Sequence, residues 1–333
     1  MTDNTTVEYR VVEGELISVS DGDTANFVAK GMDWVQHLPE KGKPNSKGGY
    51  LRLRFQGIDT PELHYPPPRS TFIDLAAKRR GVPLFPLPMV MYEQPMGKEA
   101  GDALKALTGF DNLDVRYVPA FVLTRGADGY GRLIAYILLA QDVDNLVHNT
   151  SIPVSEELLK RTLNYKMLAN GMAYYTGYGR MPPEHRHTFI GQSNDARKHE
   201  RGIWNSKVAP DPKAPFSLVD EGSLGRKGQL ILPKLFRRCI AYQFAVNADD
   251  YRGNLTHWMQ RTRLVPGAEN TDLVHVRHQT EPVPFDELIR CDGQTIQLLE
   301  DPVNMLFLEA PRSAFPDPVP TDDEDDGQDA PIV

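Results

Sequence analysis

Apolar and polar residues alternate along several stretches of the first half of the chain, which is the pattern of β-strands with one buried face. These stretches are residues 8–19, 24–30, 50–58, 113–124 and 132–139. Only a few residues, centred on Asp21-Gly22-Asp23, separate the first two stretches. The sequence therefore predicts a hairpin at that position, followed by three further strands.

Helical periodicity interrupts these strands at three places. Residues 97–107 put Ala100, Leu104 and Leu107 on one helical face. Residues 155–171 begin with Ser155 and two acidic residues and end at a glycine, which predicts one capped amphipathic helix. A further helix is expected over residues 193–201.

Two long segments lack either pattern. Residues 31–49 are rich in glycine, proline and lysine, and residues 63–95 contain many prolines, with room for a helix only around residues 73–80. Loops of this length usually serve as lids or binding surfaces, or are partly disordered.

The composition changes after residue 205. We expect a linker at 206–216, a small α+β domain at 217–315 and an acidic disordered tail at 316–333. In the small domain we expect helices beginning near Pro233 and around residues 255–260, and strands near 272–278, 295–299 and 304–310. The sequence assigns no chemistry to this domain.

The overall composition is that of an ordinary globular protein. Of 333 residues, 40% are hydrophobic, no apolar run is long enough to cross a membrane, and the beginning MTDNTTVEYR is unlike a secretory signal peptide. We therefore expect a cytoplasmic protein, unless it is exported by another route. Cys239 and Cys291 are too few for a disulfide framework or a zinc cluster, and are expected to be ordinary small apolar residues.

The net charge of −8 does not exclude a nucleic-acid partner. Six of the acidic residues lie in the ending TDDEDDGQDAPIV, so the rest of the chain is close to neutral. The tail is expected to be solvated; the alternative is that it competes with phosphates for a basic patch.

Three short motifs carry chemical groups of the same kind: DGDT at residues 21–24, RFQGIDTPE at 54–62 and DGYGR at 128–132. Each by itself could be structural: a turn, a helix N-terminus and a hairpin turn, respectively. Together their carboxylates suit a hard divalent cation, and their arginines suit a phosphate. The combination is typical of phosphoryl transfer.

The order of these motifs, followed by LANGMAYY and DARKHERGIW, resembles the staphylococcal nuclease (thermonuclease-like) family from about residue 11 to residue 204. The resemblance implies an α+β fold, a five-stranded OB-fold barrel capped by helices. It also implies hydrolysis of DNA and RNA phosphodiesters with calcium, leaving a 3′-phosphate and a 5′-hydroxyl. Magnesium and manganese are alternative ions.

The resemblance assigns the metal site to four residues. Asp23 and Asp59 would ligate the ion together with the backbone carbonyl of Thr60, and Asp21 would act through a metal-bound water.

The resemblance also assigns three catalytic residues. Glu62 would orient or deprotonate the attacking water, and Arg54 and Arg132 would bind the phosphate and stabilise the charge of the transition state.

Tyrosines that stack on the nucleotide correspond to Tyr130 and Tyr174. The chain departs from the family pattern at Thr176, where a further tyrosine is expected, and at Gly129, where a lysine is expected. These departures concern placement of the nucleotide rather than the chemistry.

Other residues could assist, each with a structural alternative. Basic residues of the two long loops would follow the nucleic-acid backbone or be solvated: Lys41, Lys43, Lys47, Arg69, Lys78, Arg79 and Arg80. The sequence KLFRR at 234–238 could grip nucleic acid or form the wet face of a helix. His64 could carry a proton or lie on the surface, and residues 185–187 (HRH) lack a third metal ligand nearby.

The expected partners are DNA, RNA or both, with no membrane and no assigned protein partner. The rival hypothesis is a catalytically silent module of the same fold that only binds nucleic acid or protein. Because every catalytic position holds its expected residue, the sequence favours the enzyme.

Overall fold

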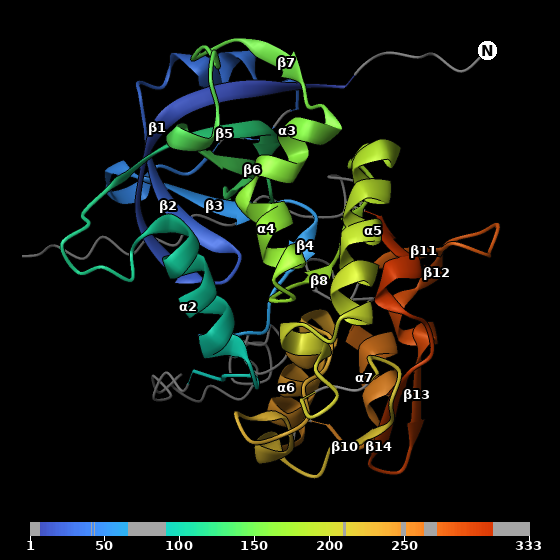
Figure 1. Cartoon of the computed structure of the whole chain (residues 1–333). Coiled ribbons are helices and arrows are strands. Elements are labelled where there is room, and N and C mark those ends of the chain that lie inside the picture. The colour runs from blue at the N-terminus through green and yellow to red at the C-terminus, as the bar shows by residue number, and fades with distance from the viewer. Residues whose placement is uncertain are drawn as a thin grey trace, which may run out of the picture.

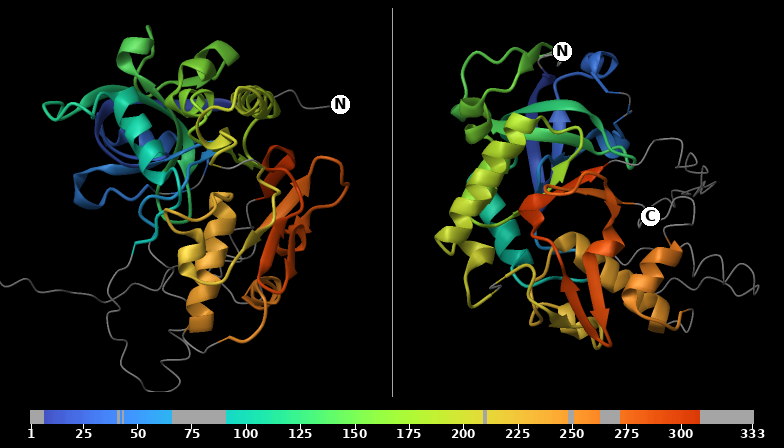
Figure 2. Two further views of the ribbon diagram at one scale, coloured as in Figure 1. Left: turned by 60° about the horizontal axis from the view of Figure 1, so that its bottom comes forward. Right: turned by 90° about the vertical axis from the view of Figure 1, so that its right-hand side faces the viewer.

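The computed structural model describes residues 7–40, 42, 44–65, 91–208, 211–247, 251–262 and 272–308, and all structural statements concern these residues. Figure 1 shows a barrel formed by the first half of the chain, and a group of helices and strands formed by the C-terminal part. The helix α5 (Pro183–Lys198) runs along the side where the two adjoin. The two further views in Figure 2 also show them side by side.

The barrel has five strands: β1 (Glu8–Asp21), β2 (Thr24–Ala29), β3 (Leu51–Phe55), β5 (Val118–Ala127) and β6 (Leu133–Leu139). They are ordered β2-β3-β6-β5-β1, and an additional pairing of β2 with β1 closes the sheet. Only β3 and β6 pair in parallel; the other barrel neighbours are antiparallel. This confirms the predicted OB-like barrel. A short strand, β7 (Ser151–Pro153), extends the sheet beyond β1.

Alternation along each strand fills the barrel interior. Leu16, Phe27, Leu53, Val122 and Ile137 are completely buried, one from each barrel strand. Burying each such side chain contributes about 1.5–3 kcal/mol. The predicted strands are therefore confirmed, with ends shifted by a few residues.

Helices cover the barrel on one side. Helix α2 (Gly97–Thr108) packs against β1, and α4 (Leu163–Ala169) packs against β6 and α5. The single helix predicted over residues 155–171 is wrong: α3 (Glu156–Arg161) ends at Thr162, whose backbone is extended. The Thr162 hydroxyl accepts a hydrogen bond from the Tyr165 amide at 3.1 Å, which begins α4 as a new helix.

Helix α5 begins at Pro183, well before the predicted residue 193, because a proline is tolerated at the first position of a helix. Three short strands lie outside the barrel. Strand β4 (Ile58–Asp59) comes before α2, and strands β8 (Tyr174–Tyr175) and β9 (Gly177–Tyr178) come between α4 and α5. Short 3-10 turns occupy Asp33–His37, Lys47–Gly49, Ala140–Asp142, Gly202–Trp204, Glu221–Leu224, Phe285–Leu288 and Pro302–Asn304.

The C-terminal part contains two helices and two small sheets, which confirms its expected α+β elements. The helices are α6 (Pro233–Asn247) and α7 (Leu255–Thr262). The strands are β10 (Phe216–Ser217), β11 (Leu273–Val276), β12 (Val283–Pro284), β13 (Ile289–Asp292), β14 (Thr295–Leu298) and β15 (Met305–Leu308). The sheets are ordered β10-β14-β13 and β12-β11-β15-β9.

The second of these sheets joins the two parts of the chain, because β15 pairs in parallel with β9, which belongs to the first part. The second hydrophobic core likewise contains Tyr174, Ala196, Ile203 and Trp204 together with residues 216–307. The predicted domain boundary at residue 205 therefore separates residues that pack in one hydrophobic core. Domain bounds remain a prediction of the sequence.

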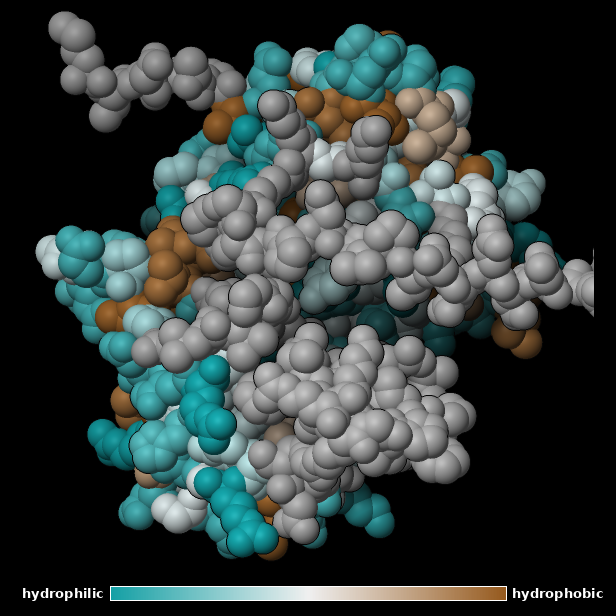
Figure 3. All heavy atoms as spheres, turned by 180° about the vertical axis from the view of Figure 1, so that it is seen from behind, coloured by the Kyte–Doolittle hydropathy of each residue, from teal (hydrophilic) through white to brown (hydrophobic). Residues whose placement is uncertain are grey.

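Among the described residues, no helix combines the length and the apolar character that crossing a membrane requires. On the face opposite to Figure 1, the described surface is mainly hydrophilic, with separate hydrophobic patches (Figure 3).

Candidate active site

The DGDT turn and the strand of Arg54 meet at one end of the barrel. Strand β2 pairs with β3 so that Thr24 lies opposite Arg54. The Phe55 amide also donates to the carbonyl of Asp23 at 3.0 Å. This register places Asp23 beside Arg54, although the two are far apart in sequence.

Arg54 forms ion pairs with two predicted metal ligands. Its guanidinium contacts the Asp23 carboxylate and lies 2.5 Å from Asp59 Oδ1. The Asp59 side chain is only 1% exposed and that of Arg54 is 16% exposed. Burial alone would lower the pKa of Arg54, but the carboxylates of Asp23 and Asp59 raise it above its ordinary value. Arg54 therefore stays charged.

The loop that carries Asp59 and Thr60 is held against the DGDT turn. The Thr60 amide donates to Asp23 Oδ2 at 3.0 Å, and Thr60 is buried. Strand β4 pairs Asp59 with Tyr174 of β8. The Asp23, Asp59 and Thr60 positions are therefore fixed relative to one another.

Gly22 allows this close approach. A Cβ atom at this position would lie 2.9 Å from Thr60 Cγ2 and 3.0 Å from the Cβ of Ala100. The backbone of Gly22 is not left-handed, so the glycine is required for space rather than for the conformation of the turn.

Replacing Gly22 by alanine is expected to destabilise the protein by about 1–3 kcal/mol, because the added methyl group pushes the turn away from Thr60. Urea unfolding measures this change. Gly129→Ala is the matched control, since nothing lies within 4 Å of a Cβ there. Equal stabilities for the two variants would contradict the assignment of Gly22 to packing.

Glu62 is positioned by a residue that the sequence did not single out, Gln94. The Glu62 amide donates to Gln94 Oε1 at 3.1 Å, and the Gln94 amide donates to the Glu62 carbonyl at 2.7 Å. Gln94 is completely buried, and its Nε2 donates to the Ile231 carbonyl at 3.0 Å. Gln94 thus connects Glu62 to the C-terminal part. A lone glutamine in a proline-rich segment gives no sequence signal of this role.

Arg237 of α6 also reaches the site. Its Nη2 lies 2.8 Å from Asp59 Oδ2, its Nη1 lies 3.3 Å from Asp59 Oδ1, and it forms an ion pair with Glu62. The side chains of Arg237 and Glu62 are 19% and 16% exposed. The sequence placed Arg237 only within a basic stretch that was expected to grip nucleic acid or face water.

The pKa values of the two carboxylates are shifted in opposite directions. Burial raises the pKa of Glu62 to about 7, although the charge of Arg237 opposes this shift. Burial would also raise the pKa of Asp59, but Arg237 and Arg54 together hold it below its ordinary value.

Asp21 and His64 lie at the rim of the site. His64 Nδ1 is 3.3 Å from Asp21 Oδ1, with side chains 55% and 19% exposed. Burial and the nearby Asp23 carboxylate raise the pKa of Asp21, while the hydrogen bond with His64 opposes this. His64 is therefore a surface residue that contacts Asp21.

Arg132 directly precedes β6, next to the strand of Arg54. Its Nε donates to Asp128 Oδ2 at 2.7 Å, and its guanidinium carbon lies 5.5 Å from the centre of the Tyr130 ring. Tyr130 is 71% exposed. In this structure the Arg132 side chain thus contacts its own hairpin, whereas Arg54 and Arg237 contact the carboxylates.

The structure places Tyr174 in the interior rather than at an open surface. It is 1% exposed, and its ring packs edge-on against Trp204 with 5.2 Å between ring centres. Stacking of a nucleotide on Tyr174 would require this packing to open. Thr176, which departs from the family pattern, is also buried.

The described carboxylates are oxygen donors of the kind that calcium and magnesium prefer, so the donor chemistry fits such an ion. However, among the described residues no group of three or more His, Cys, Asp or Glu side chains is arranged to hold a metal. An ion would have to share Asp23 and Asp59 with Arg54.

His185 is a core residue, with Nδ1 3.1 Å from the Tyr136 hydroxyl and Nε2 2.9 Å from the Val154 carbonyl.

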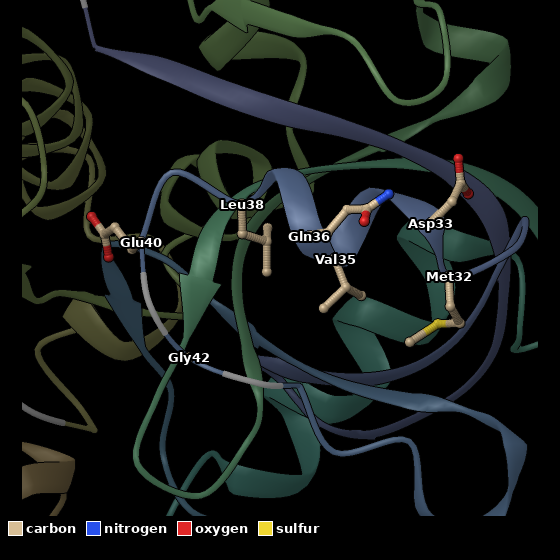
Figure 4. Close-up of a pocket in the computed structure, with 7 residues that line it drawn as sticks. All are labelled: Met32, Asp33, Val35, Gln36, Leu38, Glu40 and Gly42. Carbon is tan, nitrogen blue, oxygen red and sulfur yellow. The ribbon is translucent and has the colours of Figure 1, made fainter.

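The segment of residues 31–49 forms a separate hollow, lined by Met32, Asp33, Val35, Gln36, Leu38, Glu40 and Gly42 (Figure 4). The segment is joined to the β5–β6 hairpin, because the Asn45 amide donates to the Gly131 carbonyl at 2.9 Å and Glu40 pairs with Arg125. Of the basic loop residues predicted to follow nucleic acid, only the backbone of Lys47 is described; the others lie outside the described residues.

The first part of the chain is a closed OB-like barrel with arginine–carboxylate pairs at one end. In agreement, residues 52–206 match the family described as staphylococcal nuclease homologue. Residues 52–206 are therefore similar to that family. The match begins after the DGDT turn, which the Asp23–Arg54 ion pair joins to it. No curated protein matches the chain.

Proposed function

We propose that this protein is a calcium-dependent nuclease that hydrolyses phosphodiester bonds of DNA, RNA or both and leaves 3′-phosphate ends. The observation that carries the proposal is the convergence of Asp23, Arg54, Asp59 and Glu62 at one end of a barrel of the nuclease family. Carboxylates beside a permanently charged guanidinium provide both a water-activating group and a phosphate-binding group.

Each residue has a role in this proposal. Arg54 binds the phosphate and stabilises the negative charge that develops on it, and Glu62 orients or deprotonates the attacking water. Asp23, Asp59 and the Thr60 carbonyl would hold the divalent ion, which supplies further charge stabilisation when it is bound.

Three predicted residues have supporting roles. Asp21 lies at the rim, where it would contact a metal-bound water. Arg132 would turn from Asp128 towards the phosphate, and the exposed Tyr130 ring offers a stacking surface for a base. We do not assign stacking to Tyr174, because it is buried.

A second candidate function is nucleic-acid binding without cleavage. The observation that favours it is the engagement of both Asp59 and Glu62 by Arg237, which competes for groups that catalysis needs.

Release of acid-soluble nucleotides from single-stranded and duplex DNA and RNA, with calcium, magnesium or manganese, separates the two functions. Cleavage by the wild-type protein is expected, and Glu62→Gln is expected to lower kcat by roughly 10²–10⁴-fold because the general base is lost. Glu15→Gln, at an exposed position of β1, is the matched control and should retain full activity. Binding of nucleic acid without cleavage under any of these ions would establish the silent module instead.

A further inference from the structure

Helix α6 carries three basic residues whose partners lie in different parts of the chain. Lys234 Nζ and Arg238 Nη2 lie 3.0 and 2.8 Å from Asp272 Oδ2, and their side chains are 8% and 6% exposed. Arg237 points instead to Asp59 and Glu62. The two ion pairs with Asp272 therefore fix the rotation of α6 about its axis and keep Arg237 directed towards the site.

The position of α6 is fixed by packing as well as by charge. Phe236, next to Arg237, is completely buried and packs edge-on against Tyr65 with 6.0 Å between ring centres. Just before the helix, the Ile231 carbonyl accepts the hydrogen bond from Gln94, which also holds Glu62. Withdrawing Arg237 with its helix would expose this shared core. The backbone of Arg237 is thus held beside the site.

Two guanidinium groups lie beside the carboxylates of the site. The buried Asp23 and Asp59 and the partly exposed Glu62 each contact Arg54, Arg237 or both. The resemblance assigns the second arginine to Arg132, whose side chain pairs with Asp128. In this structure the second guanidinium beside the carboxylates is therefore that of Arg237.

The guanidinium group suits this task. It presents five N–H donors in a planar fork, so contacts with two carboxylates leave donors for a phosphate oxygen. Its charge also persists at any physiological pH.

We propose that Arg237 is a phosphate-binding arginine of the active site, which acts beside Arg54 and is supplied by the C-terminal part of the chain. This inference rests on the proposed nuclease function. It implies that the C-terminal part contributes a residue to the active site.

Kinetics of the full-length chain test the proposal. Arg237→Ala is expected to lower kcat by roughly 10²–10³-fold, the loss typical of one preorganised donor to a developing charge. Arg237→Lys should recover part of the rate, because it keeps the charge but loses the fork. Guanidinium ion added below unfolding concentrations should partly restore the rate of Arg237→Ala. Arg277→Ala, at an exposed position of the same part, is the matched control.

A binding measurement keeps the test independent of cleavage. In the Glu62→Gln background, Arg237→Ala is expected to weaken the binding of a short fluorescein-labelled oligodeoxynucleotide by about tenfold or more, measured by fluorescence anisotropy. Melting curves establish that each variant is folded. If Arg237→Ala does not fold, Arg237→Lys carries both measurements.

The outcomes separate this inference from the proposed function. If the wild type cleaves and folded Arg237→Ala cleaves equally well or faster, Arg237 restrains the site and the inference is overturned. If the wild type cleaves nothing with any ion, the proposed nuclease function fails. In that case, an unchanged oligonucleotide affinity of Arg237→Ala overturns the inference as well, and a weakened affinity supports phosphate binding by Arg237.

Discussion

Replacing Arg54 by alanine is expected to reduce phosphodiester cleavage by at least 10²–10³-fold and to destabilise the fold by about 3–5 kcal/mol. Both effects have one cause. Arg54 lies between the buried carboxylates of Asp23 and Asp59, so its removal takes away the proposed phosphate ligand. It also removes the ion pair of Asp23 and leaves Asp59 with Arg237 alone. Urea unfolding and nucleotide release measure the two effects on the same protein preparation.

Calcium should distinguish the two effects of Arg54→Ala. An ion that binds only the folded state stabilises it, and a site freed of one of its two competing guanidiniums should gain more from the ion. We therefore expect calcium to raise the melting temperature of Arg54→Ala more than that of the wild type, without restoring cleavage. Arg52→Ala, an exposed arginine of the same strand, is the control. Full activity of Arg54→Ala would contradict the proposed site.

Replacing Trp204 by alanine is expected to destabilise both parts of the chain together by about 3–5 kcal/mol, because Trp204 lies in the core that they share. Its ring packs against Tyr174, and the guanidinium carbon of Arg197 lies 5.4 Å from its centre. Arg197 in turn lies 2.5 Å from Asp301 of the C-terminal part.

The chain has three tryptophans, so removing Trp204 leaves Trp34 in the barrel core and Trp258 in the second core as reporters. Trp34→Phe and Trp258→Phe in the Trp204→Ala background each leave a single reporter. Both reporters are expected to show the same lowered urea midpoint. The control is Leu113→Ala, at a side chain 91% exposed, which should change stability by less than about 0.5 kcal/mol. An unchanged midpoint at Trp34 would mean that the parts unfold independently.

The sequence predicted much of the barrel because its signals are local. Alternation over residues 8–19 and 24–30 identified two strands, and the hairpin between them followed from their spacing. A local hydrogen bond also explains why the single helix predicted over residues 155–171 is wrong. A cap at Thr162 ended one helix and began another, although the apolar periodicity continued through it.

The interpretation of the DGDT turn changed for a related reason. Its glycine suggested a chain reversal, but its neighbours in space are Thr60 and Ala100, which belong to other elements. The spatial constraint on Gly22 is visible only when these elements are packed together.

The sequence by itself determined the barrel strands, the nuclease family resemblance and the grouping of Arg54, Asp59 and Glu62 within one short segment. Only the tertiary structure decided that Arg237, 178 residues from Asp59, joins this group, that Gln94 holds Glu62, and that Tyr174 is buried. The physical reason is the separation along the chain of the residues that interact. Periodicity and capping act between neighbours in the chain, whereas an ion pair between a helix and a distant loop depends on how two cores pack against each other.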